Sequence, residues 1–442
     1  MERPSEMGLR AREVPAEVRA VLARLGEAGH RSWLVGGVVR DLLLRRERHD
    51  PSEFDVATPA TPSQVQALFR KVIPTGIDHG TVTVVESGQR IEVTTFRGEE
   101  GYEDGRRPSR VTFHDDLEAD LARRDFTVNA MAWDPLADEL RDPSGGRRDL
   151  ARRVIRCVGD ARARFAEDGL RPLRAARFVA QLGFRLAPDT RAAIPGALPI
   201  VALVSRERVA EELSRLLVGP AAAAGLATLR ATGLLGVVLP RLAALPPGRV
   251  RHAIAVASEP FVGCAAGRGA DRERCRLLRM AALLHVLPPE EAMQAVVELR
   301  LPNRLATGVV ALSGGRCGLD ASGPPAGAGA AGARRWIASV GREQAPLFLA
   351  LWEADARHQG ARSAARSAEV RRLSARVRRE LAAGVPLSLG ELALGGRDVM
   401  ALLPGVEGKQ VGEALRALLD EVLGEPSLNT KARLSERLRA WG

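Results

Sequence analysis

Two spacings of apolar residues divide this chain into a part that mixes helices with strands and a longer part made of helices. Within residues 1–150, stretches with an apolar residue every three or four positions take turns with short stretches of alternating apolar and polar residues. The first spacing places apolar side chains on one face of a helix, and the second on one face of a strand. After residue 150 only the helical spacing continues, so we expect an α+β fold with a mixed-sheet head and an elongated helical remainder.

Individual elements can be assigned within the first part. Gly29 is placed to end a helix, Thr61 is placed to cap the start of another, and Ser87-Gly88 separates two alternating strands. The order predicts a mixed and mostly antiparallel sheet. The predicted elements are a helix over 15–29, a strand over 32–37, a helix over 38–46, a strand over 53–58, a helix over 61–72 and a hairpin over 81–96.

The second part reads as a series of helices with one interruption. The clearest helical spacings lie at 163–184, 205–219, 225–239 and 275–287. A Gly/Ala/Pro-rich stretch with little to bury reads as a flexible linker. The predicted organisation is a head over 1–150, a helical neck over 151–235, a helical body over 236–313, the linker over 314–333 and a helical tail over 334–442.

Charge changes this picture more than overall composition does. The chain has 45% hydrophobic and 27% charged residues, which is ordinary for a folded protein, but its net charge is +11. Excess positive charge suits a polyanionic partner such as a nucleic acid, because neutralising phosphates releases counterions. A surface rich in arginine only through codon usage is the alternative.

Cysteine spacing and the lack of long apolar runs favour the cytoplasm. The four cysteines lie far apart with no CxxC pair, so we expect neither a structural zinc site nor a disulfide scaffold. No leader-like apolar segment opens the chain, and no run of about 18 apolar residues follows. We therefore expect a cytoplasmic protein with no membrane partner.

The first candidate site is "LVGGVVRD" at 34–41. Gly36 and Gly37 let backbone amides approach an anion closely, and the following helix start adds positive potential. Arg40 lies one turn into that helix and would point toward the same anion. A tight strand-to-helix turn without a ligand is the alternative.

Three carboxylates form the second candidate site. Glu53 and Asp55 lie two residues apart on one strand and so share a face, and Glu92 lies in the second strand of the following hairpin. If the two strands are neighbours, the three side chains converge and suit Mg²⁺, which prefers hard oxygen ligands. Two such ions would activate an attacking hydroxyl and stabilise a leaving pyrophosphate. Scattered surface acids are the alternative.

Two further stretches carry candidate ligands for a nucleotide. In 116–135, Arg124 would reach phosphate oxygens, Asp125 would accept from a ribose hydroxyl, and Asn129 would follow one helical turn later. In 167–178, four residues recur at every third position, which on one helix makes a single stripe. An aspartate acceptor beside an arginine donor would pair with the Watson–Crick edge of a base. The four residues are Asp168, Arg171, Arg174 and Arg177. Solvated, charged helix faces are the alternative in both stretches.

Taken in order, these motifs resemble those of the class II tRNA nucleotidyltransferase/poly(A) polymerase family. The matching stretches are "LVGGVVRD", the acid-x-Asp strand, "RRDFTVNA", "DPSGGRRDLARRVIRCVG", "RFAEDGLRPLRAARF" and "SRERVAEELSRLL". Residues 385–435 also resemble the C-terminal region of bacterial CCA-adding enzymes. The resemblance is strong over 30–240 and weak over 245–385.

The resemblance implies a fold, a reaction and a role for each candidate residue. It implies a polymerase-β-like head followed by neck, body and tail helices that hold the acceptor arm of tRNA, and addition of C, C and A from CTP and ATP. By position, Gly36, Gly37, Arg40 and Arg124 would contact the triphosphate, Asp125 and Asn129 the nucleotide, and Asp168 and Arg171 the base, with Arg174 and Arg177 alongside. Glu53, Asp55 and Glu92 would hold Mg²⁺. Asp142, Gly145 and Gly146 would be structural.

Two departures and one retained segment refine the expectation. The family pattern on the metal strand is Asp-x-Asp, whereas here Glu53 comes first. His285 is followed by Val286, so the adjacent His-Asp pair that a phosphohydrolase uses to bind metal is missing. We therefore expect no phosphatase activity. His285 is expected to be a core or surface residue. The flexible loop at 94–113, which family members that add only CC lack, favours CCA addition or A-addition over CC-addition. An A-adding enzyme, a poly(A) polymerase and an inactive tRNA-binding protein are the alternatives.

Overall fold

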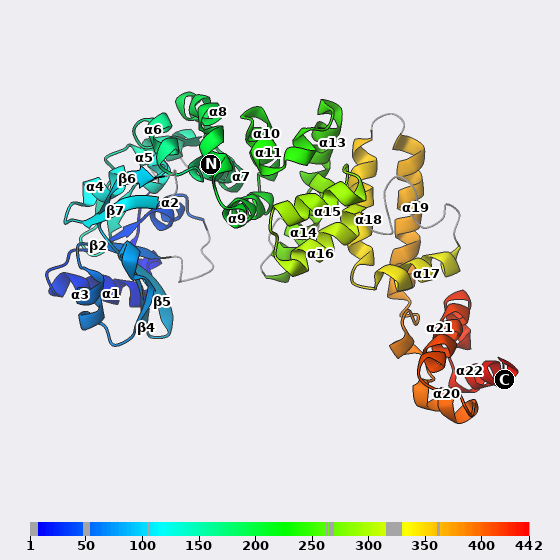
Figure 1. The fold of residues 1–442 in the computed structure, drawn as a ribbon. Coiled ribbons are helices and arrows are strands. Elements are labelled where there is room, and N and C mark those ends of the chain that lie inside the picture. The colour runs from blue at the N-terminus through cyan, green and yellow to red at the C-terminus, as the bar shows by residue number, and fades with distance from the viewer. Residues whose placement is uncertain are drawn as a thin grey trace. The chain divides into compact units, whose positions relative to one another are not determined.

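The computed structural model describes residues 8–46, 54–103, 107–261, 264, 269–314, 329–359 and 363–441. By its contacts the chain divides into two compact units, Met1–Pro240 and Arg241–Gly442. The first unit carries the strands, and the second consists of helices (Figure 1). The predicted α+β fold is therefore confirmed.

The first unit is built on one seven-stranded sheet. The strand order is β3-β4-β5-β2-β1-β8-β9. Among these pairs only β2 and β5 run parallel, so the predicted mixed and mostly antiparallel sheet is confirmed. The strands are β1 (Trp33–Val35), β2 (Asp55–Thr58), β3 (Val72–Gly76), β4 (Thr81–Glu86), β5 (Gln89–Thr95), β8 (Ala132–Asp134) and β9 (Glu139–Arg141).

The predicted helix starts and the hairpin of the head are also observed. Thr61 caps its helix through a capping box with Gln64. Ser87 and Gly88 both have positive φ, of 49° and 84°, which is the backbone twist that a two-residue hairpin requires. The helices of the head are α1 (Ala16–Glu27), α2 (Gly37–Leu43), α3 (Pro62–Leu68), α4 (Leu117–Ala122) and α5 (Gly146–Arg152).

One apolar cluster joins the sheet to helix α4. Strands β1, β2 and β8 contribute the centre of this cluster, and Leu117 on α4 packs against it. The cluster stabilises the head because apolar surface is removed from water on both elements. Its buried members are Trp33, Val35, Ala57, Phe96, Leu121 and Ala132.

Two predictions about strands were wrong. The segment expected to be a flexible loop forms an antiparallel ribbon of β6 (Arg97–Glu103) and β7 (Arg107–Phe113). After residue 150, β10 (Val154–Ile155) and β11 (Arg185–Leu186) pair in parallel. A two-stranded ribbon and a two-residue strand need no apolar face of their own, so periodicity along the sequence does not reveal them.

Further helices complete the first unit. They are α6 (Ala161–Glu167), α7 (Arg171–Leu182), α8 (Pro188–Ala202), α9 (Arg206–Leu217), α10 (Ala222–Ala231) and α11 (Leu234–Val238). The predicted single helix over 163–184 is wrong, because the chain leaves helical geometry at Asp168 and re-enters it at Arg171. Gly169 lies at this break and packs closely against a neighbouring helix, since a Cβ there would lie 2.6 Å from the backbone oxygen of Ile200.

The second unit consists of helices throughout its described residues. It begins with α12 (Pro240–Ala243), which starts at the end of the first unit. The others are α13 (Pro247–Ala257), α14 (Ala270–Leu284), α15 (Pro289–Glu298), α16 (Asn303–Gly314), α17 (Ala330–Val340), α18 (Ala345–His358), α19 (Ser363–Ala382), α20 (Gly396–Leu402), α21 (Lys409–Gly424) and α22 (Lys431–Trp441). Most of the predicted linker lies outside the described residues, and α17 begins inside its last four positions.

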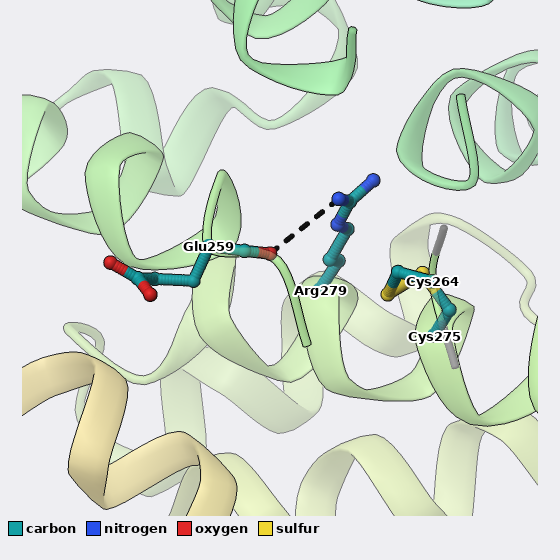
Figure 2. Close-up of a disulfide and its surroundings, with 4 residues drawn as sticks. All are labelled: Glu259, Cys264, Cys275 and Arg279. Carbon is teal, nitrogen blue, oxygen red and sulfur yellow. Dashed lines mark hydrogen bonds between the residues drawn. A yellow bond between two sulfur atoms is a disulfide. The ribbon is translucent and has the colours of Figure 1, made fainter. Parts of the chain in front are cut away.

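One disulfide is present among the described residues, although the cysteine spacing predicted no disulfide scaffold. Cys264 and Cys275 form a disulfide with a Cα–Cα distance of 5.1 Å (Figure 2). Arg279, one turn further along α14, donates to the backbone oxygen of Glu259 at 3.5 Å. Both contacts join the segment after α13 to α14. Cysteine spacing missed the pair because the two cysteines are 11 positions apart, and spacing along the sequence does not show that they meet.

His285 also differs from its prediction in one respect. Its side chain is 4% exposed, as a core histidine would be. The missing carboxylate, however, is supplied by Asp355 from α18, whose Oδ1 lies 3.3 Å from Nε2 of His285. Separately, within the described part of the chain, no helix is long and apolar enough to span a membrane.

Candidate functional site

A positively charged cavity of about 750 Å³ lies within the first unit. Among the described residues that line it, nine are arginines and three are aspartates. A concave surface with this excess of guanidinium groups attracts and orients a polyanion such as a triphosphate. The lining includes Gly36, Gly37, Arg40, Asp55, Arg124, Asp125, Asn129, Asp168, Arg171, Arg174 and Arg177, all predicted from the sequence.

The glycine turn between β1 and α2 forms one wall of the cavity. Gly36 has a φ of 75°, and a Cβ there would lie 3.0 Å from Nη1 of Arg124. A side chain would therefore both strain the backbone and displace an arginine of the cavity. Arg40, one turn into α2, donates through Nη1 to Oδ1 of Asn129 at 2.6 Å and through Nη2 to Asp41 at 2.9 Å.

A buried aspartate that the sequence analysis missed holds two of the arginines. Asp120, 1% exposed on α4, accepts from Nη2 of Arg123 at 2.6 Å and from Nη2 of Arg124 at 3.1 Å. Burial alone would raise the pKa of Asp120, but the charges of Arg124 and Arg123 lower it below its usual value. The i,i+3 and i,i+4 spacing of this acid and the two arginines could have revealed the cluster.

Asp125 has a different environment from the one predicted. Its Oδ2 accepts from Nε and Nη2 of Arg174 at 2.8 and 2.5 Å. Its Oδ1 accepts from the backbone of Phe126 at 2.8 Å and from Nδ2 of Asn129 at 3.1 Å. These four donors fill the acceptor positions of a carboxylate, so a ribose hydroxyl would have to displace one of them. Burial would raise the pKa of Asp125, but Arg174 and Asn129 lower it.

Asn129 reaches Asp125 by a route that the sequence did not predict. Helix α4 ends at Ala122, and Asn129 closes a 3₁₀ turn over Thr127–Asn129. The predicted helical turn between Asp125 and Asn129 is therefore wrong, although the two side chains do contact each other.

Asp168 and Arg171 lie at the break between α6 and α7, so the predicted single helical stripe is wrong. The guanidinium of Arg171 donates to Glu167, to the backbone oxygen of Arg164 at 2.9 Å and to that of Arg123 at 3.0 Å. Asp168 accepts from the backbone of Leu170 at 3.0 Å. The arginine donor and the aspartate acceptor are thus each oriented by neighbouring groups.

Helix α9 supplies partners that the sequence analysis did not identify. Nη2 of Arg208 lies 3.5 Å from Asp168, 40 positions earlier, and Glu212 accepts from Nε of Arg177 at 2.5 Å. The guanidinium of Arg177 also lies 4.0 Å from the centre of the Phe178 ring. Spacing along the chain gives no indication of the Arg208–Asp168 and Glu212–Arg177 pairs, because their members come from different helices.

Two of the three predicted metal ligands are neighbours in the sheet. Asp55 and Glu92 are direct partners in the parallel pair of β2 and β5. Directly opposed residues place their side chains on the same face, so these two carboxylates lie side by side. Glu92 is exposed, and Asp55 lines the cavity. Glu53 lies outside the described residues.

The motif "DPSGGRRDL" has a packing role. Asp142 accepts from the backbone nitrogens of Gly146 at 2.6 Å and Arg147 at 2.9 Å, and so provides partners for the first two N–H groups of α5. Gly146 packs so closely that a Cβ would lie 2.3 Å from the backbone oxygen of Thr127, in the 3₁₀ turn that carries Asn129. These contacts support the structural role expected for Asp142, Gly145 and Gly146.

Comparison with protein families identifies two segments. Residues 32–156 match the family described as "Poly A polymerase head domain". Residues 183–245 match the family described as "Probable RNA and SrmB- binding site of polymerase A".

Curated proteins and solved structures match along nearly the whole chain. The chain is 38% identical over 429 residues to the CCA-adding enzyme of Geobacillus stearothermophilus, covering 96% of each protein. It is 39% identical over 421 residues to that of Geobacillus thermodenitrificans, covering 95% of each. The crystal structure of the Bacillus stearothermophilus CCA-adding enzyme in complex with CTP matches with a TM-score of 0.74 and 34% identity, covering 100% of this chain and 98% of that one. The Thermotoga maritima CCA-adding enzyme complexed with tRNA-CCA shares the fold, with a TM-score of 0.63, 19% identity and coverage of 100% and 98%.

Proposed function

This chain belongs to the family of CCA-adding enzymes, which are nucleotidyltransferases, and we propose that it adds C, C and A to the 3′ end of tRNA from CTP and ATP without a nucleic-acid template. The observation that carries the proposal is the single cavity in which the glycine turn, the arginines and the Asp168–Arg171 pair meet. Because its substrates are tRNA and free nucleotides, the same proposal places the protein in the cytoplasm.

Arg40, Arg123 and Arg124 would hold the triphosphate. Their positions are set by Asn129 and Asp120 before any nucleotide enters, so little conformational freedom is lost on binding. The Nε atom of Arg124 is buried and has no hydrogen-bond partner among the described residues. A phosphate oxygen at that position would satisfy it.

Asp168 and Arg171 would select the base. Cytosine and adenine each present an amino donor beside a ring-nitrogen acceptor on the Watson–Crick edge, whereas uracil and guanine present a carbonyl beside an N–H. A carboxylate acceptor next to a guanidinium donor therefore complements C and A and opposes U and G. The contacts that Arg171 makes with Glu167 and two backbone carbonyls support this role, because they keep the donor in place.

Mg²⁺ fits the carboxylates at the edge of this cavity. Asp55 and Glu92 lie side by side on neighbouring strands and offer hard oxygen ligands. Glu53, two residues before Asp55 in the sequence, is the third candidate ligand. When bound, Mg²⁺ supplies Lewis-acid activation of the attacking hydroxyl and neutralises charge on the pyrophosphate. The chain's own part is to align the tRNA 3′-hydroxyl with the α-phosphorus while the arginines retain the leaving pyrophosphate.

A stepwise extension assay tests the reaction and separates it from the alternatives. Three tRNAs are used, ending before the first C, after CC and after CCA, with labelled CTP and ATP. We expect growth to CCA and no further. Extension of the CC-ended tRNA alone would favour an A-adding enzyme, and growth past CCA would favour a poly(A) polymerase.

A comparison with an inactive variant distinguishes an active enzyme from a catalytically inactive RNA-binding protein. Asp55→Ala removes a carboxylate of the proposed metal site and leaves the arginines in place. If wild type and Asp55→Ala are equally unable to extend any of the three tRNAs, the chain has no nucleotidyltransferase activity. The alternative of an inactive tRNA-binding protein is then favoured.

Glu53 gives the sharpest test of the metal ligands. Glu53→Asp keeps the carboxylate and matches the relatives, so we expect it to retain or raise the rate of extension. Glu53→Gln keeps the size but removes the charge, so we expect it to nearly abolish extension. Equal rates for Glu53→Gln and wild type would show that Glu53 is not a ligand.

A further inference from the structure

Three side chains that could bind a metal meet in the second unit, and none of them lines the cavity of the first unit. His252 comes from α13, His285 follows α14 and Asp355 comes from α18. One ligating atom from each lies within 4.8 Å of the other two. Oδ1 of Asp355 is 2.7 Å from Nε2 of His252 and 3.3 Å from Nε2 of His285.

The backbone around the two histidines determines which ring nitrogen carries the hydrogen. Nδ1 of His285 lies 2.6 Å from the backbone oxygen of Ala282, and Nδ1 of His252 lies 3.3 Å from that of His358. A carbonyl oxygen only accepts, so each Nδ1 is the donor, and in a neutral ring Nε2 is left with a lone pair. Both lone pairs then face a carboxylate oxygen, which is also an acceptor. Three acceptors that face one another need a positive charge between them.

We propose that His252, His285 and Asp355 bind one divalent transition-metal ion, of which Zn²⁺ is the best match. Two imidazole nitrogens and one carboxylate oxygen are a donor set typical of zinc and its first-row neighbours. In a tetrahedral site with bonds of about 2.0–2.1 Å, ligand atoms lie about 3.3–3.4 Å apart. The observed 3.3 Å fits, and the 2.7 Å contact has to open by a few tenths of an ångström.

The groups around the cluster match those that support metal ligands. Metal-binding histidines usually donate their other N–H to a carbonyl or carboxylate, as both do here. Nε2 of Gln359 donates to the second oxygen of Asp355 at 2.5 Å and so orients the carboxylate. The nearby acid Glu259 is paired with Arg357 and His358, at 2.8 and 2.7 Å, which leaves Asp355 as the carboxylate of the cluster.

The exposure of the three side chains indicates from which side a water molecule would reach the metal ion as its fourth ligand. His285 and Asp355 are each 4% exposed, whereas His252 is 22% exposed. Water would therefore reach the ion from the His252 side. Because its ligands come from positions 252, 285 and 355, a bound ion would join three segments of the second unit and stabilise its folded state.

Metal binding to the full-length, untagged protein tests this inference. The protein is stripped with a chelator and equilibrated with Zn²⁺ in the presence of excess Mg²⁺, in an Asp55→Ala background that removes one carboxylate of the proposed metal site in the head. We expect one tightly held zinc per chain by atomic emission. A hundredfold excess of Zn²⁺ over its Kd should raise Tm by about 5 °C.

Ligand variants and a neighbouring control determine where the zinc binds. His252→Gln and His285→Gln should each weaken zinc binding by more than about 100-fold and remove the Tm shift. His358→Gln should retain both, because the side chain of His358 contacts Glu259 and only its backbone oxygen contacts His252. His252→Gln is the safer variant for folding, since its side chain is partly exposed.

Either of two results overturns the inference. One is zinc uptake by the wild-type protein that is no greater than that of His252→Gln. The other is zinc binding that His358→Gln loses and His252→Gln keeps. In both cases Nε2 of the two histidines carries protons instead, and the cluster is a set of charged hydrogen bonds without a metal.

Discussion

At the scale of single residues, the cavity is organised by buried acids that hold its arginines in place. Asp120 holds Arg123 and Arg124, and Asp125 holds Arg174. Both acids are buried, whereas their arginine partners are partly exposed, so breaking a pair leaves an uncompensated carboxylate in a poorly solvated place. The arginines therefore keep their positions without a nucleotide, and the cavity is pre-formed for an anion.

The Asp168–Arg171 pair leads to a prediction about base selection. Asp168→Ala should lower kcat/KM for CTP about 10- to 100-fold, because one good base contact contributes about 1–3 kcal/mol to discrimination. Discrimination against UTP should fall as well, and single-nucleotide incorporation measures both. Arg162→Ala removes an exposed arginine of α6 that does not line the cavity, and should leave both quantities unchanged. Unchanged selectivity in Asp168→Ala would contradict the assigned role.

Asp120 leads to a prediction about stability and its pH dependence. Asp120→Asn should destabilise the first unit by about 3–5 kcal/mol at neutral pH and raise KM for both nucleotides, because two arginines lose their partner. The pKa of Asp120 is lowered in the folded state, so its contribution is complete above the unfolded pKa of about 3.9 and is lost as the pH falls through the lower, folded value.

Urea unfolding at several pH values between 6 and 3 measures this contribution. The difference in free energy of unfolding between wild type and Asp120→Asn should shrink as the medium is acidified. Glu118→Gln changes an exposed acid of the same helix and should show almost no difference at any pH. A constant difference across the range would contradict the pKa assignment.

At the scale of elements, close backbone packing places the residues of the cavity. Helix α5 approaches the 3₁₀ turn that carries Asn129 so closely that position 146 has room only for a hydrogen atom. The parallel pairing of β2 with β5 likewise sets Asp55 opposite Glu92. A shift of one residue in that register would turn one of the carboxylates to the other face of the sheet.

The packing of α5 can be tested with two glycines. Gly146→Ala should destabilise the first unit by at least about 2 kcal/mol, because its Cβ would lie 2.3 Å from the backbone oxygen of Thr127. Gly26→Ala, in an exposed position of α1 with nothing within 4 Å, should be neutral or stabilising by up to about 1 kcal/mol. Thermal unfolding compares them, and equal Tm values for the two variants would show that α5 moves freely.

At the scale of the whole molecule, excess positive charge is the property most relevant to a tRNA substrate. The chain carries 65 basic and 54 acidic residues. Many of the arginines in the cavity are neutralised by internal partners, so the charge that attracts tRNA also has to come from elsewhere on the surface. Its interaction with a polyanion is screened by salt, whereas buried pairs such as Arg177–Glu212 are screened much less.

This charge leads to a prediction about tRNA binding. The Kd for tRNA should rise more than about tenfold between 50 and 200 mM monovalent salt, because bound phosphates release counterions. Filter binding or fluorescence anisotropy measures the change, and Tm over the same range serves as the control and should change little. A Kd independent of salt would mean that contacts other than phosphate contacts dominate tRNA recognition.

Sequence alone determined the class of fold, several element boundaries and the identity of most candidate residues. Apolar periodicity is a local property of helices and strands, so the mostly antiparallel sheet, the cap at Thr61 and the Ser87-Gly88 hairpin could be predicted. The glycine turn, the arginines and the Asp168–Arg171 pair could be identified because each motif is contiguous in the chain.

Only the tertiary structure decided which distant residues meet. Arg208 reaches Asp168, Asp55 faces Glu92, and His252 and His285 converge on Asp355. The same is true of the disulfide and of the saturated carboxylate of Asp125. Most of these contacts join residues 11 to 103 positions apart, and local periodicity carries no information on how the chain folds back between them. Their geometry is set by the packing of whole elements, which is why the sequence predicted most residues that line the cavity but not the partners that hold them.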